Sequence, residues 1–118
     1  MKKLLVIILF SISTLSCEKN YLIPEKEIPD WLKSEIKVSE QRIQDNPKCL
    51  SAWGAWTRSE WQNEYYFEYI NPLSSFLCGP ISQKGDTLNI YTGTAYLDYG
   101  KERCCTHYVW KGPLFKEF

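Results

Sequence analysis

The residues best suited to chemistry lie near the C-terminus of the 118-residue chain, where Cys104-Cys105-Thr106-His107 brings together two thiols and the single histidine. A structural zinc site needs four ligands, and this group lacks the Cys-x2-Cys spacing typical of one. Catalysis by a thiol needs a base within hydrogen-bond reach and a thiol that stays reduced. The segment therefore predicts neither a metal site nor a catalytic cysteine.

Disulfide bonding is the remaining interpretation of the cysteines. Adjacent Cα atoms lie about 3.8 Å apart, below the usual disulfide range of about 4.4 to 6.8 Å, so we expect Cys104 and Cys105 to bond elsewhere. On a strand their side chains would point to opposite faces, and the Cys104 face carries more aromatic residues. Cys49 follows the predicted helix and so lies on the helix side of the sheet, where the more aromatic Cys104 face should pack. Among three possible connectivities, this favours one bond from Cys49 to Cys104 and another from Cys78 to Cys105.

Three acidic residues, Glu60, Glu64 and Glu68, have a spacing that invites comparison with the paired carboxylates of a glycosidase. On a hairpin, such residues are more typical of a solvated surface near a turn. The chain has no glycine-rich phosphate loop, no Ser-His-Asp pattern and no His-x3-His pair. The sequence therefore predicts no catalytic residue, no metal site and no cofactor.

The N-terminus has the pattern of an export signal: two lysines precede an apolar run over residues 4–12, and Ser16-Cys17 follows. An apolar run of about nine residues is roughly half the length of a membrane-spanning helix. The segment resembles the signal of bacterial lipoproteins, which implies cleavage after Ser16 and acylation, for example by palmitate, at Cys17. It departs from that pattern at Thr14, where leucine is favoured. An ordinary signal peptide cleaved nearby is the alternative.

The cysteine count agrees with this interpretation, because lipidation at Cys17 would leave four of the five cysteines to pair. We expect residues 1–16 to be the signal peptide, 17–27 the lipidated cysteine and a tether, and 28–118 one small domain. Loss of the two signal lysines from a balanced 14 basic and 14 acidic residues leaves a net charge of −2. That balance argues against a nucleic-acid partner. The expected location is the periplasm or the cell surface, attached to the membrane by the lipid.

One helix is predicted over residues 30–44. Pro29 suits the helix start, and Asp30 complements the positive end of the helix dipole. Pro47 ends the helix because the residue before a proline is pushed out of the helical region. The apolar residues at helical spacing, which predict the buried face, are Trp31, Leu32, Ile36 and Ile43.

Beyond Pro47 the pattern favours short strands rich in aromatic residues. Candidate strands cover residues 50–57, 61–70, 75–82, 87–92, 94–99 and 104–111, with turns at 58–63, 83–86 and 100–103. In the second strand Tyr65, Phe67 and Tyr69 share the face expected to point to the core. The predicted fold is α+β: one N-terminal helix packed on an antiparallel sheet of four to six strands, linked by disulfides.

The helix start Pro29-Asp30-Trp31-Leu32, followed by aromatic-rich hairpins with scattered cysteines, resembles a group of small bacterial lipoproteins of unknown function. The resemblance covers about residues 28–92. It implies a similar fold of a helix on a sheet. It carries over no catalytic or binding residue.

Seventeen of the 102 residues that follow the signal are aromatic, which fits the packing of a small core and also fits a binding surface. Trp53, Trp56, Trp61 and Tyr66 lie on both faces of the first hairpin, and one helix can cover only one face. We therefore expect at least two of them to be exposed in a binding module of the cell envelope, whose partner is a protein, a glycan or a small apolar ligand. The alternative is a structural or inhibitory envelope protein that acts through loops or strand edges. An enzyme is the third hypothesis.

Overall fold

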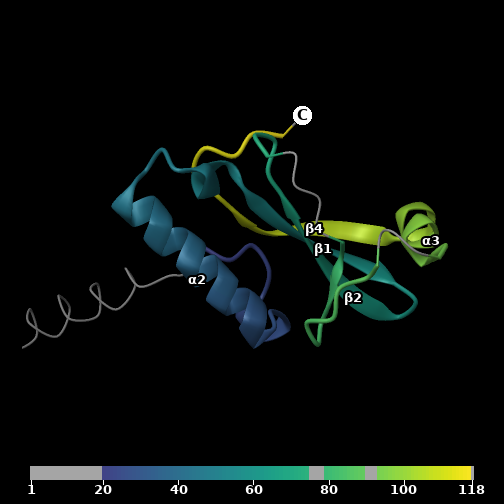
Figure 1. The fold of residues 1–118 in the computed structure, drawn as a ribbon. Coiled ribbons are helices and arrows are strands. Elements are labelled where there is room, and N and C mark those ends of the chain that lie inside the picture. Colours follow the sequence, from purple (N-terminus) through teal and green to yellow (C-terminus); the bar gives the residue numbers. More distant parts are fainter. Residues whose placement is uncertain (1–19, 75–78, 90–92, 118) are drawn as a thin grey trace, which may run out of the picture.

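The computed structural model describes residues 20–74, 79–89 and 93–117, and it has the expected α+β fold. Four antiparallel strands form one sheet in the order β3-β2-β1-β4 (Figure 1). The elements are, in chain order, the 3-10 turn η1 (Glu25–Glu27), α2 (Asp30–Asp45), the 3-10 turn η2 (Leu50–Trp53), β1 (Ala55–Trp61), β2 (Glu64–Ile70), β3 (Ile81–Ser82), α3 (Ala95–Glu102) and β4 (Cys104–Lys111). Within the described ranges no helix has the length and apolar character needed to cross a bilayer.

The helix α2 begins and ends close to the predicted positions because its boundaries are set locally. Pro29 is the N-cap, and the helix ends at Asp45, with Asn46 as the C-cap directly before Pro47. Leu32 and Ile36 are fully buried against the sheet, as their spacing predicts. Full burial of such a side chain contributes about 1.5 to 3 kcal/mol, so this stripe holds the helix in place.

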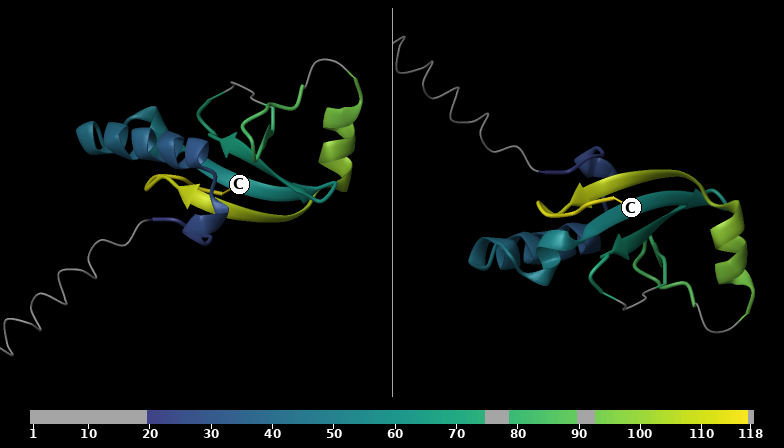
Figure 2. Two further views of the ribbon diagram at one scale, coloured as in Figure 1. Left: turned by 90° about the horizontal axis from the view of Figure 1, so that it is seen from below. Right: turned by 90° about the horizontal axis from the view of Figure 1, so that it is seen from above.

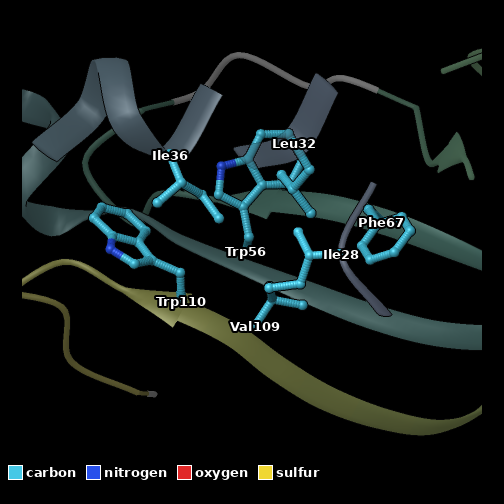
Figure 3. Packing of buried hydrophobic residues seen from close by; sticks show 7 residues of the cluster. All are labelled: Ile28, Leu32, Ile36, Trp56, Phe67, Val109 and Trp110. Atoms are coloured by element: carbon cyan, nitrogen blue, oxygen red, sulfur yellow. The ribbon is translucent and has the colours of Figure 1, made fainter. Parts of the chain in front are cut away.

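The core lies between α2 and one face of the sheet (Figure 3). The central strand β1 contributes Trp56, and its neighbour β2 contributes Phe67 from the face that the alternation predicts. The predicted core face of β2 is only partly correct, since Tyr69 remains 37% exposed. The buried cluster consists of Ile28, Leu32, Ile36, Trp56, Phe67, Val109 and Trp110.

The hairpin between β1 and β2 turns through Gln62 and Asn63, which both have positive φ angles, of 50° and 61°. Two consecutive left-handed residues are typical of the type I′ turn, whose twist matches that of paired strands. The turn is therefore shorter than the predicted span of 58–63. Strand β1 continues up to Trp61.

Three strand predictions differ from the structure. Residues 50–53 form η2 instead of the first half of a strand. Only Thr87 of the 87–92 segment makes a bridge, to Ile81, and residues 90–92 lie outside the described ranges. Of the 75–82 segment, residues 75–78 are likewise outside, and β3 covers only the last two. The predicted turn at 83–86 is present.

The predicted strand 94–99 and turn 100–103 are wrong, because most of this stretch forms the helix α3. On a helix Tyr99, Glu102 and Arg103 share one face, and these residues contact the sheet. The helices lie at different ends of the sheet (Figure 2). The local sequence of residues 94–99 also fits a strand, but the contacts that Tyr99 and its neighbours make with β1 and β2 favour the helix.

Two register shifts interrupt the pairing of β1 with β4, one between Trp56 and Thr57 and one between Arg58 and Glu60. Such bulges break the alternation of side chains along a strand. As a result Val109 and Trp110 are both buried although they are consecutive. The second shift lies beside Cys104 and Cys105, whose sulfur atoms are within 4.8 Å of each other, so the prediction that alternation assigns these cysteines to opposite faces is wrong.

No disulfide forms among the described cysteines: Cys49, Cys104 and Cys105 are free thiols. Cys49 precedes the end of β1 that pairs with Lys111, whereas Cys104 pairs with Glu60 near the other end. The eight residues of β4 rise about 3.3 Å each, so the sheet separates these thiols far beyond disulfide range. The predicted bond from Cys49 to Cys104 is therefore wrong. Cys78, the predicted partner of Cys105, lies outside the described residues.

The packed part of the chain begins earlier than the predicted residue 28. Tyr21 and Ile23 pack against the core cluster, and the amide of Leu22 donates a hydrogen bond to the carbonyl of Val109 at 2.9 Å. Residues 21–23 of the predicted tether therefore belong to the packed part of the chain.

Candidate functional site

A groove of about 620 Å³ lies where α2, η2 and the end of the β1–β2 hairpin meet. Its walls are mainly apolar, and the aromatic residues among them come from three elements. Trp31 comes from the start of α2, Trp56 from β1 and Tyr69 from β2, while Leu50 and Ile81 border the groove. The groove thus joins residues that are far apart in the sequence.

The aromatic wall is fixed by ring contacts. The rings of Trp31 and Trp56 meet edge to face, with centroids 5.9 Å apart and an interplanar angle of 71°. The ring of Trp56 lies 5.3 Å from that of Tyr69. The indole Nε1 of Trp31 also donates a hydrogen bond to the carbonyl of Gln83 at 3.0 Å. Because each ring has partners, the wall is preorganised, which lowers the entropic cost of binding a ligand.

One polar atom of this wall lacks a partner. The indole Nε1 of Trp56 is buried and has no hydrogen-bond partner among the described residues, and the residue as a whole is 7% exposed. A buried donor without an acceptor costs about 1 to 3 kcal/mol. The α2 side of the groove adds further polar groups, from Glu35, Ser39 and Arg42.

The position of Tyr69 depends on two neighbours. Asn71 donates hydrogen bonds to the Tyr69 hydroxyl at 3.1 Å and to the carbonyl of Leu50 at 2.9 Å, which links β2 to η2. Gly54 lies so close to the Tyr69 ring that a Cβ atom at this position would overlap the hydroxyl. The ring therefore occupies space that only a glycine at position 54 leaves free.

The predicted binding residues do not form one surface. Trp56 lines the groove, but Trp61 packs on the opposite face of the sheet, against Tyr66 and Tyr99. Trp56 and Trp61 are each only 7% exposed, and Trp53 and Tyr66 are half-buried. The expectation that at least two of the four are substantially exposed is wrong, in part because Tyr99 of α3 packs against Trp61 and Tyr66 at one end of the sheet.

Trp31 and Tyr69 are the groove residues that sequence reasoning assigned to the core. Each belonged to an apolar face, Trp31 beside the helix stripe and Tyr69 on the odd face of β2. No local signal distinguishes a wall of a groove from a core position. The opening also requires other elements, among them η2 with Leu50 and β3 with Ile81.

The three acidic residues do not form a catalytic pair. Glu60 points to the α2 face of the sheet, while Glu64 and Glu68 alternate onto the other face. Glu68 accepts hydrogen bonds from the Tyr99 hydroxyl and from Arg103, each at 2.6 Å. Burial, and then the hydrogen bond to Glu68, raise the pKa of Tyr99 to about 12. This network fastens α3 to the sheet.

A second group of reactive side chains gathers where β1 and β4 are paired. A carboxylate oxygen of Glu60 and the sulfur atoms of Cys104 and Cys105 all lie within 4.8 Å of one another, and the three residues are exposed. Hydrogen bonding to Cys104, and then to Glu60, raises the pKa of the Cys105 thiol to about 12. His107, the next candidate in the sequence motif, is exposed and is not part of this group.

The chain matches no protein-family model, no curated protein and no solved structure.

Proposed function

We propose that the chain is an exported, lipid-anchored binding module of the bacterial cell envelope, and that the groove between α2, η2 and the β1–β2 hairpin holds its ligand. The observation that carries this proposal is the aromatic wall of Trp31, Trp56 and Tyr69, whose rings are fixed by contacts with one another. Concave sites that combine an apolar lining with a few polar groups are the usual form of small-molecule sites.

The size and lining of the groove indicate the chemistry of the ligand. A volume of about 620 Å³ lies within the usual range of small-molecule sites, about 300 to 1,000 Å³. The rings of Trp31, Trp56 and Tyr69 suit a flat apolar body. Arg42, which also lines the groove, favours a ligand that carries an acidic oxygen. We therefore assign a flat apolar molecule that carries an acceptor oxygen.

The groove suits binding better than catalysis. Ser39, Ser51 and Cys49 are its potential nucleophiles, and within the described part of the chain none of them is hydrogen-bonded to Glu35, the carboxylate of the lining. Nucleophilic catalysis needs a base within such reach.

The anchoring part of the proposal rests on the sequence from the two N-terminal lysines to Cys17. Because Tyr21 already packs on the domain, only residues 18–20 would separate a lipid at Cys17 from the folded part. Such a linker spans about 10 to 14 Å at most, so the domain would stay close to the membrane surface.

The binding test uses 1-anilinonaphthalene-8-sulfonate, a flat apolar dye with a sulfonate acceptor, and the full chain. Ser39 lines the groove, whereas Ser34 is exposed on the same helix and does not line it. Ser39→Phe should fill the groove and abolish saturable dye binding, and the matched variant Ser34→Phe should bind the dye like the wild type. Dye held by the apolar residues 4–12 is common to both variants, so the difference reports on the groove. Equal binding by the two variants, at equal stability, would reject the groove as the ligand site.

A further inference from the structure

A different part of the sheet supports a site that is independent of the groove and of the proposed function. We propose that Glu60, Cys104 and Cys105 bind a thiophilic divalent metal ion, with Zn²⁺ as the best match. Their three potential ligand atoms lie within 4.8 Å of one another, and all three residues are exposed.

The backbone brings these side chains together against the normal rule for a strand. Neighbouring residues of a strand point to opposite faces, so two adjacent thiols would ordinarily be kept apart. Here Cys105 has a φ of 61°, and the register between β1 and β4 shifts between Arg58 and Glu60. The bulge redirects Cys105 toward the side of Cys104. Bulges commonly re-aim a side chain in this way.

The third ligand comes from the partner strand. Glu60 of β1 is the register partner of Cys104 of β4. Directly opposed residues of an antiparallel pair have Cβ atoms about 4.5 to 5.5 Å apart, which brings the carboxylate beside the thiol. The Sγ atom of Cys104 already lies 4.0 Å from Oε2 of Glu60. The site is therefore held by sheet pairing, and it closes with side-chain rotations alone.

The distances fit a metal of this size. Zn²⁺ binds sulfur at about 2.3 Å and carboxylate oxygen at about 2.0 to 2.2 Å, so tetrahedral ligand atoms lie roughly 3.3 to 3.8 Å apart. Contraction from the present separations requires shifts of about an ångström in exposed side chains, which are free to move. Three protein ligands would leave the fourth tetrahedral position to water.

The donor set selects among metals. Two thiolates favour soft and borderline ions, and the added carboxylate favours Zn²⁺ over Cu⁺, which prefers sulfur alone. The hard ions Mg²⁺ and Ca²⁺ require oxygen ligands and are excluded by the thiols. Each thiol gives up its proton when it binds the metal.

The test uses the full chain, kept reduced, stripped of metal with a chelator, and then titrated with Zn²⁺ in competition with a chromophoric chelator. The wild type should bind one equivalent. The double variant Cys104→Ser/Cys105→Ser should lose more than about 100-fold in affinity, beyond the 10- to 100-fold typical of residues that only support a ligand. Cys49→Ser, which removes a described thiol at the other end of β1, is the matched control and should bind like the wild type.

Cobalt titration separates the ligands from one another. Co²⁺ bound by thiolates gives a sulfur-to-metal charge-transfer band that grows with the number of thiolates. Glu60→Gln should weaken binding but keep the band of two thiolates, whereas Cys105→Ser should halve it. Wild-type binding by the double variant would overturn the site, and so would a wild-type band in Cys105→Ser. A reduced wild-type chain that takes up no metal would overturn it as well.

Discussion

Trp31 and Trp56 meet edge to face with ring centroids 5.9 Å apart. Through this contact α2 contributes side chains both to the core and to the wall of the groove. Trp31 also meets Phe67 edge to face at 5.8 Å, on the next strand of the sheet. Neighbours of Trp31 on the same helix, Leu32 and Ile36, are fully buried. The wall of the groove is therefore continuous with the core, so the two can be tested by separate substitutions on one helix.

The packing of α2 on the sheet predicts that replacing two adjacent residues, Ile36 and Lys37, lowers stability to very different extents. Ile36→Ala should destabilise the fold by about 2 to 5 kcal/mol, because the side chain is fully buried and its removal leaves a cavity. Lys37→Ala, on the exposed side of the helix, should change stability by less than about 0.5 kcal/mol. Urea unfolding followed by circular dichroism measures both. Similar midpoints for the two variants would show that the helix does not pack through this stripe.

Replacement by alanine should lower stability to different extents at two buried glycines, Gly112 and Gly54. At Gly112 an added Cβ would overlap the backbone carbonyls of Ala52 and Ser51, which cannot move without shifting η2. At Gly54 it would overlap the ring of Tyr69, a partly exposed side chain that can turn away. Gly112→Ala should therefore cost about 1 to 3 kcal/mol, and Gly54→Ala less.

The Gly54→Ala substitution also tests the groove. Because Gly54→Ala displaces Tyr69, it should weaken binding of the naphthalene dye while most of the stability is kept. Dye titration and urea unfolding on the same samples measure both effects. Unchanged dye binding by a folded Gly54→Ala chain would mean that Tyr69 is not part of the ligand site.

Several elements are predictable from the sequence because their determinants are local. Pro29 and Pro47 bracket α2, and β4 matches the predicted strand at both ends. By contrast, α3 depends on Tyr99 reaching Trp61 and Tyr66, two residues of the hairpin that lie far away in the sequence. A short segment with mixed periodicity becomes a helix or a strand according to which of the two buries its aromatic ring. That outcome cannot be predicted without knowing where the sheet lies.

The candidate sites depend even more on distant contacts. The adjacent thiols of β4 converge only because a bulge forms against β1, and the residues that shift the register are about 45 positions apart in the sequence. Likewise the groove requires Trp31, Leu50 and Tyr69 to meet. Alternation along a single strand gives the wrong result for Cys105 because it assumes an uninterrupted ladder.

The pKa of Tyr99 predicts how stability changes at alkaline pH. In the unfolded chain a tyrosine has a pKa of about 10, whereas burial and the hydrogen bond to Glu68 raise the pKa of Tyr99 in the fold to about 12. The stabilisation associated with the protonated phenol is complete below pH 10. It is lost as the pH rises from about 10 to about 12, because the unfolded chain ionises first.

Replacement of the phenol isolates this effect. Tyr99→Phe should be less stable than the wild type at neutral pH, and the difference between the two should shrink between about pH 10 and 12. Urea unfolding at intervals of half a pH unit measures that difference, with Tyr96→Phe, on an exposed position of the same helix, as the matched control. A constant difference across this window would show that the phenol of Tyr99 does not ionise at a higher pH in the fold than in the unfolded chain.

The proposed anchor predicts that Cys17 carries a lipid. Metabolic labelling with an alkyne analogue of palmitate in a bacterial host should tag the wild-type chain and should not tag Cys17→Ser, because acylation of a lipoprotein signal requires the cysteine that follows the cleavage site. Cys49→Ser keeps the signal intact and is the matched control, so it should be labelled like the wild type. Separation of membranes from soluble fractions should show the same pattern. Equal labelling of Cys17→Ser and the wild type would exclude Cys17 as the attachment point, and the short apolar segment would then be an ordinary export signal.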